Sequence, residues 1–175
     1  MATRFDLDDV QQVAGFTEAR HNAEHVWKEN GGADVPVDLI KIIASLGLQR
    51  LKTTELPSYV RGICLEIEPG KGAIAYKEGS SQSKKWVVAH EIGHWCMGHV
   101  SSFGEPIGRL PGHQEQEAEA FAGALLIPQS DLLAFCKKTK PSLAQIQRRY
   151  AVTANEATIA IKRPGILKYI SAPQV

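Results

Sequence analysis

The stretch of sequence that decides the fold is WVVAHEIGHWCM, residues 86–97. Apolar residues flank three ionisable ones, and this pattern predicts a buried helix that carries His90, Glu91 and His94. Positions i and i+4 of a helix lie on one face, so His90 and His94 can present two imidazoles to one metal ion. Burying such polar groups without a ligand would cost free energy. The stretch therefore predicts a metal centre.

Zinc suits this donor set, because catalytic zinc sites combine histidine and carboxylate ligands and leave one position open for water. Glu91 follows the first histidine, where a general base for that water is needed. Gly93 makes the helix less favourable by about 1 kcal/mol relative to Ala, which is tolerated mainly where another group approaches closely. We expect one Zn²⁺ per chain, with Glu91 as the catalytic residue of a hydrolytic reaction.

The third metal ligand is expected on the next predicted helix, because Val100 excludes the pattern in which a histidine at position 100 completes the site. Glu115 and Glu119 share one face of this helix, and Glu117 points well away from it. We take Glu115 as the ligand and Glu119 as a partner that fixes the tautomer of a ligand histidine. The reverse assignment stays open. So does the alternative that these acids only favour the start of a helix.

Around this centre the chain predicts an α+β fold of helices, a small sheet and further helices. Helices are expected over 17–30, 39–46, 86–97, 114–127, 129–138, 142–150 and 154–162, and strands over 48–51, 60–67 and 73–76. We expect one domain over 1–175, with residues 1–15 loose and 130–175 packed on it as a helical segment. Strand 73–76 is expected at a sheet edge, where an extended substrate could add as a strand; an interior position is the alternative.

The composition is that of an ordinary globular chain, with 43% hydrophobic and 22% charged residues. A net charge of +1 argues against bulk nucleic-acid binding. No apolar run approaches the ~20 residues of a membrane span, and the start of the chain lacks a secretory signal. Cys64, Cys96 and Cys136 fit reduced thiols better than a disulfide framework. We therefore expect a cytoplasmic protein without a membrane partner.

The motifs resemble the ImmA/IrrE family of bacterial zinc metallopeptidases. Four segments carry the resemblance: VPVDL at 35–39, GAIAY at 72–76, VAHEIGH at 88–94 and EQEAEAFAGALLIP at 115–128. The resemblance implies a zincin-like fold with a small antiparallel or mixed sheet. It also implies His90, His94 and Glu115 as zinc ligands and Glu91 as general base. Glu119 departs from the family, which usually has Asn or Asp there.

The resemblance further implies an endopeptidase that cleaves a cognate helix-turn-helix transcriptional repressor and so releases prophage, mobile-element or stress-response genes. The alternative is a regulatory or toxin–antitoxin partner that keeps the zincin fold only to bind protein or DNA. His99 and His113 are further candidates, as groups that stabilise an oxyanion. His21 and His25 are expected at the surface.

The C-terminal segment 142–163 also resembles a helix-turn-helix, with apolar positions that include Ile146 and Ile159. Basic residues within it, Arg148, Arg149, Lys162 and Arg163, would allow contact with DNA or with the substrate repressor. The interpretation that we favour is a helical pair that completes the core.

Overall fold

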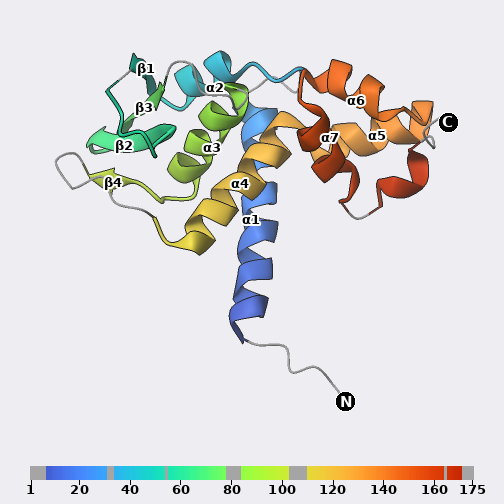
Figure 1. Ribbon diagram of the computed structural model, residues 1–175, viewed down its shortest axis with the longest axis horizontal. Coiled ribbons are helices and arrows are strands. Elements are labelled where there is room, and N and C mark those ends of the chain that lie inside the picture. The colour runs from blue at the N-terminus through green and yellow to red at the C-terminus, as the bar shows by residue number, and fades with distance from the viewer. Residues whose placement is uncertain are drawn as a thin grey trace.

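The computed structural model describes residues 7–30, 34–53, 55–77, 84–102, 110–163 and 165–170. The helices in these residues are α1 (Leu7–Asn30), α2 (Leu39–Ser45), α3 (Lys84–Cys96), α4 (Gly112–Leu126), α5 (Gln129–Thr139), α6 (Leu143–Tyr150) and α7 (Ala154–Ile161), with a short 3₁₀ helix η1 (Leu167–Tyr169). The strands are β1 (Gln49–Thr53), β2 (Gly62–Glu68), β3 (Lys71–Lys77) and β4 (Ser101–Ser102). The predicted α+β class is confirmed (Figure 1).

The sheet is mixed, with strand order β1-β3-β2-β4. In β3, Ile74 pairs with Arg50 of parallel β1 on one side and with Cys64 of antiparallel β2 on the other. The prediction that strand 73–76 forms a sheet edge is therefore wrong, because both sides of β3 are already hydrogen-bonded. β3 lies between β1 and β2, so the last of these three strands in sequence is the central one. The short β4 has no counterpart among the predicted strands.

The first helix is longer than its sequence pattern suggested. α1 begins at Leu7 rather than near Thr17, so the segment expected to be loose is helical from Leu7 onward. Leu7, Val10 and Val13 recur at a spacing of three, which is compatible with a helix, but the polar residues between them weaken this pattern. Residues 1–6 lie outside the described part of the chain.

Helices α3 and α4 pack closely, and α1 lies along α4 (Figure 1). A Cβ atom added at Gly93 would lie 3.1 Å from the carbonyl oxygen of Ala118 and 3.2 Å from Cβ of Phe121. The close approach that Gly93 was expected to permit is therefore that of α4. Small residues at this crossing bring the two helix backbones together, and fully buried Ile92 and Phe121 fill the space around it.

Helices α5 to α7 follow α4 and extend away from the sheet (Figure 1). Asp131 on α5 accepts hydrogen bonds from Arg149 at 2.8 Å and from Tyr150 at 2.7 Å. Arg163 donates to the carbonyl oxygens of Gly123 and Ile127, both at 2.6 Å. These two arginines hold the C-terminal segment to α5 and to the end of α4, which supports the interpretation of this segment as a core-completing helical pair.

The apolar residues of this helical pair only partly follow the expected pattern. Ile146, Ala157 and Ala160 are fully buried, whereas Ile159 is 49% exposed rather than packed.

None of the described helices is by itself long and apolar enough to cross a bilayer. Only α4 and α5 taken together, with a 46° bend between them, have the length and composition of a membrane span.

Candidate metal centre

Three side chains from α3 and α4 converge on one point. Nε2 of His90 lies 3.2 Å from Oε2 of Glu115 and 3.0 Å from Nε2 of His94, and His94 Nε2 lies 3.8 Å from Oε1 of Glu115. Ligand atoms bound at the usual distance to a tetrahedral zinc ion lie about 3.3 Å from one another. The three separations lie on both sides of this value, so this donor set fits a zinc ion.

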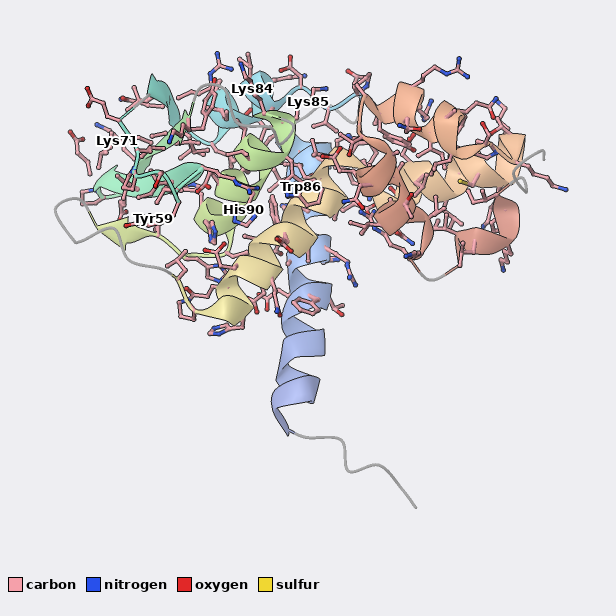
Figure 2. The ribbon with its side chains drawn as sticks, viewed as in Figure 1. Tyr59, Lys71, Lys84, Lys85, Trp86 and His90 are labelled. Carbon is pink, nitrogen blue, oxygen red and sulfur yellow. The ribbon has the colours of Figure 1, made fainter. Side chains whose placement is uncertain are left out.

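The positions of these residues follow from the local structure. His90 and His94 lie one turn apart on α3, and Figure 2 shows His90 between the sheet and α4. Glu115 belongs to the first turn of α4. Its side chain is 48% exposed and that of His90 is 15% exposed, so the point of convergence is accessible from solvent. Glu119, one turn further along α4, is exposed and is not part of this group.

Both histidines are neutral at neutral pH. Burial lowers the pKa of His94 to about 3, helped by the nearby rings of His90 and His99. Burial also lowers the pKa of His90, although the carboxylate of Glu115 opposes this shift. Because a metal binds the deprotonated imidazole, neither ring would have to lose a proton near neutral pH before binding an ion.

Glu91 lies beside the two histidines in the protein interior, with 5% of its surface exposed. Burial raises its pKa to about 8, the charge of Glu115 adds to this rise, and a hydrogen bond from the backbone N–H of Cys64 opposes it. A cation held by the neighbouring residues would favour the carboxylate form. Glu91 is therefore a buried carboxyl that accepts a hydrogen bond from the backbone of strand β2.

The edge of β2 lies directly against Glu91. The carbonyl oxygen of Arg61 accepts a hydrogen bond from Lys77 N–H at 2.8 Å, so the backbone groups of Arg61 face β3. Because these groups alternate in direction along a strand, those of Gly62 and Cys64 face the opposite edge. A Cβ atom at Gly62 would lie 2.6 Å from Oε1 of Glu91, so this close approach requires glycine.

Replacing Gly62 by Ala is expected to displace the carboxyl of Glu91 and to slow the peptidase reaction that we propose below by about 10- to 100-fold, the effect of misplacing a reacting group by about 1 Å. Zinc content should stay at the wild-type value, because the atoms nearest to an added Cβ at Gly62 belong to Glu91 and Val87 rather than to the three converging side chains. The measurement is hydrolysis rate together with bound zinc.

The matched control is Gly112→Ala, because an added Cβ at Gly112 meets no atom within 4 Å. If Gly62→Ala hydrolyses substrate as fast as this control, the close contact has no bearing on the position of Glu91.

Sequence reasoning missed a second polar pair beside these residues. Nε2 of His99 lies 3.1 Å from Oε2 of Glu117. Glu117 does point away from the face of Glu115, as predicted, but toward His99. With Nε2 engaged and Nδ1 buried, His99 presents neither nitrogen to an incoming carbonyl, so the oxyanion role does not fit it.

His113 is exposed, and its oxyanion role stays a prediction. His21 and His25 are exposed, as expected.

Comparison with known proteins places this site in a family. No curated protein matches the chain. Among solved structures, the chain is similar to a Mycobacterium tuberculosis transcriptional regulator, with a TM-score of 0.54 and 14% identity over 85% of this chain and 48% of that one. This likeness shows the fold alone, and the chain spans about half the length of that structure. Residues 55–162, which include every residue of the candidate centre, match the IrrE N-terminal-like domain of the Peptidase M78 family, and the chain therefore belongs to that family.

Proposed function

We propose that this chain is a zinc-dependent endopeptidase in which His90, His94 and Glu115 hold the ion and Glu91 is the general base. The observation that carries the proposal is the convergence of three ligand atoms within 4.8 Å of one another, next to a buried carboxyl. A binding protein would have no need of Glu91 in this position. Membership of a peptidase family supports the same reaction class.

In the proposed reaction, the residues of the chain divide the work of hydrolysis. Zinc, when bound, supplies a Lewis acid that polarises a peptide carbonyl and acidifies water. Glu91 takes a proton from the attacking water and returns it to the amine that leaves when the C–N bond breaks. The N–H of Cys64 holds the Glu91 carboxyl in place during both transfers, and the absence of a side chain at Gly62 leaves room for it there.

The substrate that we propose is a cognate helix-turn-helix transcriptional repressor, cleaved at one site in the cytoplasm. Support comes from the family and from the transcriptional regulator with a similar fold. All three cysteines are free, in keeping with a reducing compartment. Two of the four basic residues of segment 142–163, Arg149 and Arg163, are engaged within the protein, which favours a protein substrate over DNA as partner.

Metal removal tests this function. The purified chain is expected to contain about one zinc ion and to cleave the helix-turn-helix regulator encoded beside its own gene, with one new pair of fragments by mass spectrometry. Treatment with a chelator should abolish cleavage, and one equivalent of zinc should restore it. Cleavage that continues in the metal-free protein would exclude the proposed mechanism. A zinc-loaded chain that binds the regulator without cutting it would instead support the binding-only alternative.

A further inference from the structure

A second polar pair, largely shielded from solvent, joins the two elements that supply the proposed ligands. His99 follows the end of α3, and Glu117 lies on α4 two residues after Glu115. Their side chains are 9% and 16% exposed, and the distance between His99 Nε2 and Glu117 Oε2 is 3.1 Å. An interaction so shielded from water is screened less by solvent and salt than a surface ion pair. The pair therefore links α3 to α4 close to the candidate metal centre.

His99 also contacts His94 directly. The backbone N–H of His99 donates to the carbonyl oxygen of His94 at 2.8 Å. The two rings meet edge to face, with their centroids 5.7 Å apart and an interplanar angle of 63°. His94 makes a second edge-to-face contact with His90, at 4.6 Å and 81°. The orientation of the His94 ring thus depends on both neighbouring imidazoles.

These contacts bear on where the ring hydrogens of His99 and His94 lie. Donation to Glu117 requires a ring hydrogen of His99 on Nε2, and in a neutral imidazole this is the single ring hydrogen. Its Nδ1 is then an acceptor. If His94 binds an ion through Nε2, its own hydrogen lies on Nδ1, which is a donor. Both Nδ1 atoms are buried and have no hydrogen-bond partner in the described part of the chain.

We propose that His99 and Glu117 are positioning residues for His94: Glu117 fixes the tautomer and orientation of the His99 ring, and that ring fixes His94 with its Nε2 lone pair directed at the metal. This inference rests on the proposed function, because it assumes that His94 is a zinc ligand. Groups that support a ligand histidine in this way typically contribute 10- to 100-fold to metal affinity.

The test is zinc affinity, measured on the full chain by competition with a chromogenic chelator. His99→Phe keeps the ring but removes both nitrogens, and Glu117→Ala removes the acceptor. Each is expected to weaken zinc binding by about 10- to 100-fold, and the double variant should be no weaker than the poorer single variant. Glu117→Gln should recover most of the affinity, because its amide oxygen can accept the same hydrogen bond from His99.

The visible absorption spectrum of the cobalt-substituted protein provides a second measurement, since it reports ligand geometry and would not respond to a loss of stability alone. It is expected to change in His99→Phe and in Glu117→Ala. Glu18→Gln is the control, because it removes an exposed carboxylate on α1 and should change zinc affinity by less than about 5-fold.

The outcomes separate the two proposals. If the wild-type chain binds zinc tightly and both His99→Phe and Glu117→Ala keep its affinity and its cobalt spectrum, the positioning role is wrong and the proposed function stands. If the wild-type chain binds no zinc, the proposed function fails, and this inference fails with it.

Discussion

Replacing Glu91 by Gln is expected to lower the rate of peptide hydrolysis by about 10²- to 10⁴-fold, the usual contribution of a general base. Gln has nearly the same shape as Glu but cannot take a proton from water. Bound zinc should stay at one ion per chain, because Glu91 is not among the three side chains that converge. The measurement is the hydrolysis rate at saturating zinc, together with metal analysis of the same sample.

The folded state is expected to tolerate this substitution. Burial raises the pKa of Glu91 to about 8, above its ordinary value, so in the metal-free protein near neutral pH the folded state favours the uncharged carboxyl that Gln resembles. The thermal midpoint of metal-free Glu91→Gln should therefore equal or exceed that of wild type. Glu18→Gln, at an exposed position on α1, is the control. Unchanged hydrolysis by Glu91→Gln would mean that another group acts as base.

Replacing Glu115 by Gln is expected to weaken zinc binding by more than about 100-fold, beyond the upper end of the loss seen when only a supporting group is removed. The carboxylate oxygens of Glu115 lie 3.2 Å from His90 Nε2 and 3.8 Å from His94 Nε2, whereas Glu119 is outside this group. A neutral amide is a poorer ligand for zinc than a carboxylate. Titration against a chromogenic chelator measures the affinity of the variant.

Glu119→Gln distinguishes the two possible assignments of the third ligand, since it makes the same chemical change one turn along the same helix. Its zinc affinity should remain within about 5-fold of the wild-type value. Zinc should raise the thermal midpoint of Glu119→Gln but hardly that of Glu115→Gln, because a ligand stabilises the folded state only if it binds. The opposite order of effects would identify Glu119 as the ligand.

Features set by local spacing were predictable from the sequence. His90 and His94 lie on one face of α3 because four residues make about one turn, and no other part of the chain is needed to establish this. The helices after α3 follow apolar periodicity, and α4, α5 and α7 end shortly before a proline. The bounds of α4, for example, differ from the prediction by only one or two residues. Helix spacing placed Glu115 and Glu119 on one face and left the choice between them open, and the family resemblance also implied Glu115.

Features set by long-range pairing were not predictable in this way. The central position of β3 depends on β1 pairing with it across some twenty intervening residues, and nothing in the segment 73–76 itself records that partner. The contact between Gly62 and Glu91 depends on strand register, and the His99–Glu117 pair depends on the path of the chain after α3. For Gly62 the only available signal was a glycine inside a strand pattern, which often marks a close backbone approach.

The bonds from Arg163 to the last carbonyls of α4 have a consequence for the opposite end of that helix. α4 is a single rigid element of 15 residues, so whatever fixes its C-terminus also limits how far its first turn can shift or rotate. Glu115 and Glu117 both extend from the N-terminal half of α4. A residue close to the end of the chain, 36 and 40 positions from the carbonyls that it binds, thus helps to set where these two carboxylates stand. Substitutions far from the chemistry can therefore reach it through one helix.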